Sequence, residues 1–112
     1  MEEARRTRRT NALLSSFNIE LTRAQALTQA KRLAVLQHPD RQRIIQLLER
    51  YPDQLYVVEI ASVLGIAYSA ACYHLYKLAG ANLVTKEWYE HRLYYQLNIQ
   101  ALAEHREAVK TV

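Results

Sequence analysis

The chain has 112 residues, half of them hydrophobic, with two glycines, two prolines, one cysteine and a net charge of +4. This length fits a single domain with a modest core, and the composition is that of a helix-rich globular protein. One cysteine excludes an intrachain disulfide, no apolar run reaches the roughly 18 residues of a membrane span, and the charged amino end excludes a secretory signal. We therefore expect a cytoplasmic protein that has no membrane partner.

Residues 1–10 form a basic segment, which we separate from a domain that spans residues 11–112. The segment carries Arg5, Arg6, Arg8 and Arg9 against Glu2 and Glu3. A flexible arm of this kind can lie along a DNA minor groove, where the potential is negative, or remain a solvated tail. Both interpretations stay open.

Two helices are expected in the first half of the domain. The first spans residues 11–37 and carries an apolar face made of Leu21, Ala24, Leu27, Ala30, Leu33, Ala34 and Leu36. The second begins at Pro39, which suits a first helical turn, and places Arg41 and Arg43 outside its core stripe. A break at residues 51–53 and a short strand at residues 54–56 follow.

Residues 57–78 read as two short helices joined through Gly65. Apolar residues at the spacing i, i+3, i+4 and i+7 mark the buried stripe of the first helix, and Gly65 supplies a sharp turn. The second helix ends at Ala79-Gly80 and buries Ala71, Leu75 and Leu78. Ser69, Tyr73, Tyr76 and Lys77 must then point outward, with Cys72 and His74 on the two borders.

The carboxy-terminal part adds two strands and a last helix. We expect strands over residues 82–88 and 92–97, joined by a turn at Glu90-His91, with one of Tyr94 and Tyr95 in the core. The last helix is capped by Asn98 and presents an apolar edge made of Ile99, Leu102, His105 and Val109. The predicted fold class is mainly α with a small β-hairpin, a winged helix-turn-helix.

Several segments together carry a family resemblance. They are the run from Leu36 through His38-Pro39-Asp40-Arg41 to Leu48, then Glu59-Ile60-Ala61, Ser69, His74-Leu75, and Tyr94-Tyr95-Gln96-Leu97. Over residues 30–105 the chain resembles the arsenic-repressor (ArsR/SmtB) family of transcriptional regulators. The resemblance implies a homodimer closed by the first and last helices, which binds double-stranded DNA and acts as a repressor.

The candidate DNA-binding residues come from the second helix of the pair and from the hairpin. They are Tyr68, Ser69, Ala70, Tyr73, His74 and Lys77 on the helix, and Lys86, His91 and Arg92 on the wing. Tyr73 stands where the family commonly has arginine, and Tyr68 where glutamine is common. Residues 51–80 carry two acids against one lysine, which is an unusual charge for a DNA-reading segment. For His74, a half-buried structural hydrogen bond remains as open as a DNA contact.

No metal, cofactor or effector is assigned. Residues 55–59 contain no sulfur where the family can carry a Cys-x-Cys, and the last helix offers only Glu104, His105 and Glu107 as ligand types. We therefore expect no metal sensing. Cys72 is a possible redox residue, but the chain has no second cysteine to resolve a sulfenic acid, so a passive role is the alternative.

An enzyme is excluded, because the sequence shows neither a nucleophile with its base nor a Gly-rich phosphate loop. Two interpretations remain. The first is a homodimeric, sequence-specific DNA-binding regulator. The second is a degenerate winged helix that binds a protein partner through its tyrosine-rich recognition helix.

Overall fold

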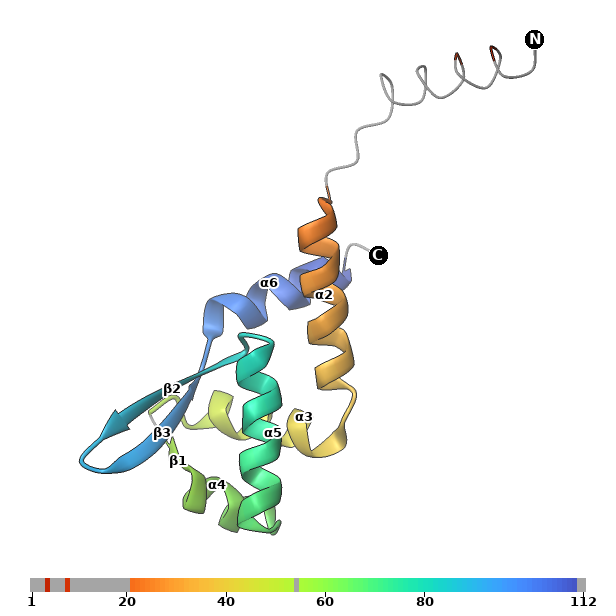
Figure 1. The fold of residues 1–112 in the computed structure, drawn as a ribbon. Coiled ribbons are helices and arrows are strands. Elements are labelled where there is room, and N and C mark those ends of the chain that lie inside the picture. The colour runs from red at the N-terminus through yellow and green to blue at the C-terminus, as the bar shows by residue number, and fades with distance from the viewer. Residues whose placement is uncertain (1–3, 5–7, 9–20, 54, 111–112) are drawn as a thin grey trace.

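The computed structural model describes residues 4, 8, 21–53 and 55–110, and its fold is shown in Figure 1. The helices in these residues are α2 (Arg23–Leu36), α3 (Pro39–Arg50), α4 (Val57–Leu64), α5 (Tyr68–Gly80) and α6 (Ile99–Lys110), and the strands are β1 (Leu55–Tyr56), β2 (Val84–Tyr89) and β3 (Arg92–Leu97). The fold is thus mainly helical with a small sheet, as predicted. The division between a basic arm and a domain at residue 10 lies outside the described residues.

The three strands form the wing. They are antiparallel in the order β1-β3-β2, and the hairpin register pairs Val84 with Leu97 and Tyr89 with Arg92. Glu90 and His91 both have positive φ, 47° and 66°, which is the two-residue turn that matches the twist of a hairpin. The predicted hairpin and the predicted short strand beside it are both confirmed.

Left-handed residues end both helices of the helix-turn-helix. Gly65 has φ 69°, and the next N–H, from Ile66, donates to the carbonyl oxygen of Ala61. Helix α5 ends at Gly80, as predicted, and the left-handed residue that follows it is Asn82, with φ 60°. Asn82 therefore belongs to the cap of α5, and β2 begins two residues later than expected.

The core lies between α3, α4, α5 and the base of the wing. Its largest fully buried side chains are Ile44, Leu48, Ile60, Leu75, Leu78 and Leu83. Tyr95 on β3 belongs to this core, whereas Tyr94 is half-buried, so the predicted alternation is confirmed. In the described residues no single helix is long and apolar enough to span a membrane; α4 and α5 would reach that length together, but they are bent by 110°.

Helix α2 buries a different face from the predicted apolar one. Thr22 caps it by accepting from the N–H of Gln25, and its buried residues are Arg32 and Val35. Leu27 and Leu33, on the predicted face, are 60% and 50% exposed. The apolar stripe of α2 is therefore uncovered in the protomer. The predicted part of this helix before residue 21 lies outside the described range.

Helix α6 corrects part of the predicted apolar edge. Asn98 caps it as expected, because its Oδ1 accepts from the N–H of Ala101. Leu102 and His105, however, are buried within the protomer, since α6 packs back on the domain and crosses α2 (Figure 1). Of the predicted edge, Ile99 and Val109 remain exposed.

A buried arginine joins these outer helices to α5. The Nε of Arg32 donates to the carbonyl oxygen of Ala81, which is the C-cap of α5, at 3.3 Å. Its Nη1 lies 3.6 Å from a carboxylate oxygen of Glu104 on α6. Cations are favoured at the carboxyl end of a helix, so Arg32 stabilises the end of α5 while tying it to α2 and α6.

Candidate nucleic-acid interface

Helix α5 holds a polar and aromatic face outward, as the sequence predicted. Ala71, Leu75 and Leu78 anchor its inner side in the core. Among the predicted contact residues, Tyr68, Ser69 and Tyr73 are exposed, and Ala70 and Lys77 are half-buried. Tyr73 and Tyr76 are 53% and 71% exposed, so their rings project from the helix. An anchored helix that exposes such a face has the arrangement of a recognition helix.

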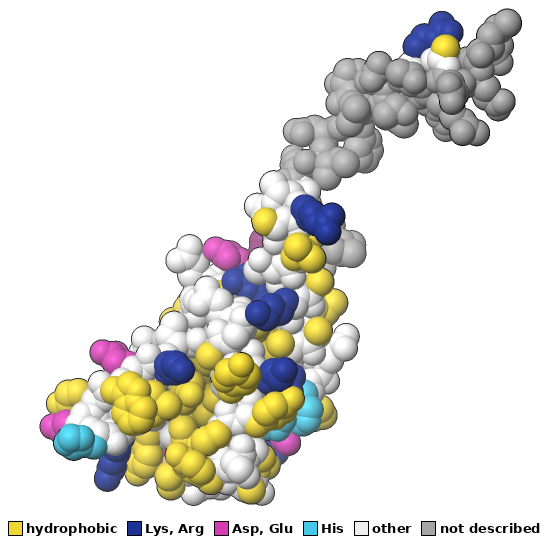
Figure 2. Space-filling view, in the orientation of Figure 1, with side chains coloured by type: hydrophobic (Ala, Val, Ile, Leu, Met, Phe, Trp, Pro, Cys, Tyr) yellow, Lys and Arg dark blue, Asp and Glu magenta, His cyan; other side chains and the backbone are white. Residues whose placement is uncertain are grey.

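The wing places its three predicted residues on the surface. Lys86, His91 and Arg92 are all exposed. The guanidinium carbon of Arg92 lies 4.9 Å from the ring centroid of Tyr56 in a cation–π contact. This contact restrains the cation at the start of β3, next to the hairpin turn. Figure 2 shows hydrophobic side chains spread over the helix-turn-helix and the wing on this face, with basic side chains dispersed among them.

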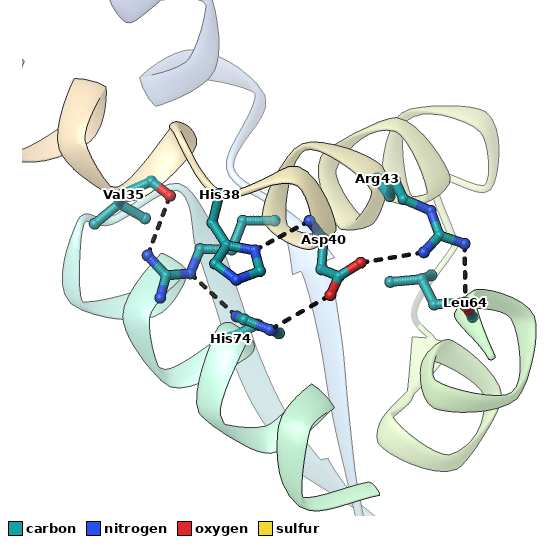
Figure 3. A network of polar contacts seen from close by, with 7 residues as sticks. Val35, His38, Asp40, Arg43, Leu64 and His74 are labelled. Atoms are coloured by element: carbon teal, nitrogen blue, oxygen red, sulfur yellow. Dashed lines mark hydrogen bonds and ion pairs between the residues drawn. The ribbon is translucent and has the colours of Figure 1, made fainter. Parts of the chain in front are cut away.

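His74 lies inside the protein and not on the helix border. It is 6% exposed, its Nδ1 accepts from the Nε of Arg41 at 3.2 Å, and its ring lies 4.4 Å from that of His38 (Figure 3). Burial, followed by the neighbouring His38 and Arg41, lowers the pKa of His74, so its neutral form is favoured. The prediction of a border position is wrong, and His74 positions α5 from within.

Arg41 is the cation that the sequence interpretation missed. Besides its bond to His74, its Nη1 donates to the carbonyl oxygen of Val35 at 3.3 Å. Its guanidinium carbon lies 5.7 Å from the ring centroid of Tyr73, and the Nζ of Lys77 lies 5.6 Å from the same centroid. The Tyr73 ring is thus flanked by two cations, one from outside the helix-turn-helix.

The charge of Arg41 is not neutralised by a carboxylate in the described residues. Its hydrogen-bond partners there are neutral acceptors, a carbonyl oxygen and an imidazole nitrogen, and Lys77 forms no ion pair within the same ranges. The position of Arg41 one turn into a helix that starts at His38-Pro39 was visible in the sequence. The direction of the Arg41 side chain depends on how α3 packs against α5, and no local sequence pattern predicts that packing. The low charge of α5 itself is therefore partly offset by α3.

Three side chains of metal-ligand type meet beside this arginine. One potential ligand atom from each of His38, Asp40 and His74 lies within 4.8 Å of the others. The Nδ1 of His38, however, accepts from the N–H of Asp40, and the Nδ1 of His74 accepts from Arg41. A neutral imidazole has one acceptor nitrogen, so each Nε2 carries the proton. Metal-bound histidines instead donate their second nitrogen to an acceptor, so this cluster does not fit a transition metal.

Cys72 is half-buried and faces tyrosines. The charge of its thiolate is the main cause of the raised pKa of Tyr68. Burial is the main cause of the raised pKa of Tyr95, to which Cys72 also contributes. Cys72 is therefore a close electrostatic neighbour of Tyr68, a predicted contact residue. The possible redox role of Cys72 stays a prediction.

Comparison with known proteins agrees with this geometry. A family described as "Helix-turn-helix domain" matches residues 31–87. The crystal structure of a possible transcriptional regulator for arsenical resistance is 32% identical, with a TM-score of 0.66 over 72% of this chain and 82% of that one. No curated protein matches the chain.

Two more distant structures share the fold. A homodimeric winged helix-turn-helix DNA-binding domain from Mycobacterium bovis, a possible ArsR-family regulator, is 22% identical, with a TM-score of 0.69 and coverage of 86% of this chain and 87% of that one. The transcriptional repressor PagR of Bacillus anthracis is 22% identical, with a TM-score of 0.66 and coverage of 78% and 99%. This chain belongs to the ArsR family of winged helix-turn-helix DNA-binding transcriptional regulators, and is not an enzyme.

Proposed function

We propose that the protein is a homodimeric, sequence-specific repressor that binds double-stranded DNA through α5 and the wing. The observation that carries the proposal is the outward face of α5, where Ser69 and Tyr73 project from a helix fixed by buried residues on its other side. The similarity to a possible arsenical-resistance regulator and to a repressor supports this direction of regulation.

The dimer is proposed to close through α2 and α6. Leu27 and Leu33 leave an apolar stripe uncovered on α2, and Ile99 and Val109 do the same on α6. A domain of this size has limited apolar surface to bury by itself, so a two-fold contact between these helices adds stability. Two α5 helices related by the two-fold axis would then reach successive major grooves about one DNA turn apart.

The contacts divide into two roles. Tyr68, Ser69, Ala70 and Tyr73 are proposed to meet base edges, because they occupy the amino-terminal half of α5. Lys77, Lys86, His91, Arg92 and Arg41 are proposed to hold the sugar–phosphate backbone. Phosphate contacts fix register and base contacts select sequence, so mutation can separate the two groups.

DNA binding by variants tests this division. Removing one phosphate contact lowers the slope of log affinity on log salt by about 0.9, whereas removing a base contact costs about 1 to 3 kcal/mol at the preferred site. Tyr73→Ala and Ser69→Ala should reduce discrimination with little change in slope. Lys86→Ala with Arg92→Ala should weaken all duplexes alike. Equal effects of both pairs on slope and discrimination would contradict the assignment.

A second candidate function rests on the same tyrosines. Tyr68, Tyr73 and Tyr76 are all more than half exposed on one short helix, and exposed tyrosines are favoured at protein–protein interfaces. In this interpretation the winged helix binds a protein partner. Its affinity for any duplex would then stay at the non-specific level, about 10⁻⁴ to 10⁻⁶ M at physiological salt.

Metal sensing is not part of the proposal. The cluster of His38, Asp40 and His74 is internally hydrogen bonded, and the last helix offers few ligands. Cys72 is kept as a possible redox residue, since it lies one turn from Tyr68 on α5, beside the proposed DNA face. Loss of DNA binding on oxidation of the unmodified protein, with binding retained in Cys72→Ser, would support that role.

A further inference from the structure

A groove between the wing and the helix-turn-helix has an apolar part that the proposed DNA contacts do not explain. Its volume is about 540 Å³, and it is bounded by the first turns of α4 and α5 and by the hairpin. The lining residues are Tyr56, Val57, Val58, Tyr68, Trp88, His91, Arg92 and Leu93. This volume is within the usual range of small-molecule sites.

The groove is lined mainly by aromatic and aliphatic side chains that stay exposed. Trp88 is 70% exposed and Val58 is 52% exposed, and Tyr68 adds a third large side chain. Trp88 lies opposite Leu93 in the β2–β3 ladder, so both side chains are on the same face of the sheet. The charged phosphates of DNA are a poor match for these apolar groups. Clustered exposed apolar side chains of this kind mark a binding site.

The charged side chain that lines the groove is a cation, Arg92. Arg92 is held against the Tyr56 ring at 4.9 Å and forms no ion pair with a described residue. His91 is a further polar side chain at the rim, and neither aspartate nor glutamate is among the described lining residues. Glu59, Glu87 and Glu90 adjoin lining residues in sequence but do not line the groove. The carboxylate of Glu59 accepts from the N–H of Tyr56 in the α4 capping box, and Glu87 lies on the opposite face of the hairpin from Trp88. The groove is therefore suited to an anion.

We propose that this groove binds a small aromatic carboxylate. Its ring would lie among Tyr68, Trp88 and Leu93, where flat apolar surface is available, and its carboxylate would pair with the restrained guanidinium of Arg92. Tyr68 and Arg92 also belong to the proposed DNA interface. A bound carboxylate therefore excludes DNA from the same residues and acts as an inducer. Only this last consequence rests on the proposed function.

Calorimetry without DNA tests the binding itself. The probe is 4-phenylbenzoate, with 4-phenylbenzyl alcohol as the neutral isostere, titrated into the full chain. The carboxylate should bind at least about tenfold more tightly than the alcohol. Arg92→Gln should lose that preference, and Val58→Glu, which adds an acid at an exposed lining position, should weaken the carboxylate by a similar factor. Arg50→Gln removes an exposed cation from the far end of α3 and should change nothing.

Fluorescence locates the probe. Trp88 is the only tryptophan in the 112-residue sequence, so its emission reports on this groove. The probe here is benzoate, a smaller aromatic carboxylate that absorbs little at the excitation wavelength. A saturable change in emission as benzoate is added reports occupancy of the groove. Equal affinity for the carboxylate and the alcohol, an unchanged affinity in Arg92→Gln, or no saturation at millimolar concentration with folded protein would overturn the proposal.

A competition experiment separates this inference from the proposed function. With a duplex bound to the unmodified protein, 4-phenylbenzoate should release DNA with a midpoint that follows its calorimetric affinity. Simultaneous binding of probe and DNA would overturn the inducer role. A protein that binds the probe but no duplex would retain the groove site and refute the regulator instead.

Discussion

The Nε of Arg41 on α3 lies 3.2 Å from the Nδ1 of His74 on α5, so a residue outside the helix-turn-helix is fixed against the centre of the recognition helix. A second hydrogen bond, to the carbonyl oxygen of Val35, holds the same guanidinium at the junction of three helices. Its guanidinium also lies beside the ring of Tyr73. The restrained side chain cannot reach deep into a groove, so a phosphate is its natural partner.

Arg41→Gln tests this role. The amide keeps a donor for the internal bonds but removes the charge, so the slope of log affinity on log salt should fall by about 0.9 for each phosphate that is no longer bound, with equal weakening on preferred and random duplexes. Arg43→Gln is the matched control, because Arg43 pairs with Asp40 and with the carbonyl oxygen of Leu64, away from Tyr73. A lower melting temperature with an unchanged salt slope would show that Arg41 is purely structural.

The exposure of Leu27 on α2 and the burial of Leu102 on α6 predict how two leucine variants differ. Leu27→Asp should leave the fold intact, because Leu27 is 60% exposed, but should convert the dimer to a monomer by placing an unpaired charge in the contact. Leu102→Asp should destabilise the protomer itself by about 3 to 5 kcal/mol, because Leu102 is 5% exposed in its core. Sedimentation and circular dichroism measure the two effects. A monomeric unmodified protein at micromolar concentration would refute the dimer.

Transition metals should not change DNA affinity. The acceptor nitrogens of His38 and His74 are both engaged by N–H donors, and Arg41 places a positive charge at the cluster. Addition of zinc, nickel or copper should therefore alter the duplex affinity by less than about threefold, well under 1 kcal/mol of coupling. A stoichiometric metal site in calorimetry that disappears in His74→Gln and is coupled to DNA release would contradict this.

Stability should fall as the solution is acidified from about pH 7.5 to about pH 5.5. Burial, with the nearby positive groups, lowers the pKa of His74 and of His105 in the folded protein, whereas unfolded histidine has a pKa of about 6.5. The unfolded state then binds more protons below that value, so stability is fully present above it and is lost as pH falls toward the folded pKa values. Asp40, which faces His74, opposes the effect but does not reverse it.

Thermal melting across this range measures the effect. His74→Gln should give a shallower decrease, because glutamine can accept from Arg41 without titrating, and His91→Gln at the exposed hairpin turn should leave the profile unchanged. A melting temperature that is constant or rises as the solution is acidified would contradict the assignment.

Local signals in the sequence were sufficient for most of the fold. The turn at Gly65, the start of α3 at Pro39 and the cap at Asn98 each act over a few residues, and all three are observed. The alternation of Tyr94 and Tyr95 likewise needed only the two-residue period of a strand. The outward face of α5 followed in the same way, because 3.6-residue periodicity fixes which side chains oppose the buried stripe.

The remaining features depend on how distant elements pack. A helical stripe gives a direction but not the neighbour that covers it, so Leu102 was assigned to a partner when it packs in its own core. His74 was placed on a border because its contacts come from α3. Its partner Arg41 lies 33 residues earlier in the chain. The contact of Arg41 with Tyr73 was missed for the same reason, because it too joins α3 to α5. Long-range pairings of this kind leave no periodic trace in the sequence.

Selection from random double-stranded DNA tests the central claim most directly. The unmodified protein, shown to be folded and dimeric, is taken through several rounds of binding at physiological salt. We predict one enriched sequence with two-fold symmetry and half-sites about 10 base pairs apart, whose enrichment disappears in Tyr73→Ala. A pool that remains random for a folded dimer would contradict a sequence-specific regulator, and would direct attention to a protein bound at Tyr68, Tyr73 and Tyr76.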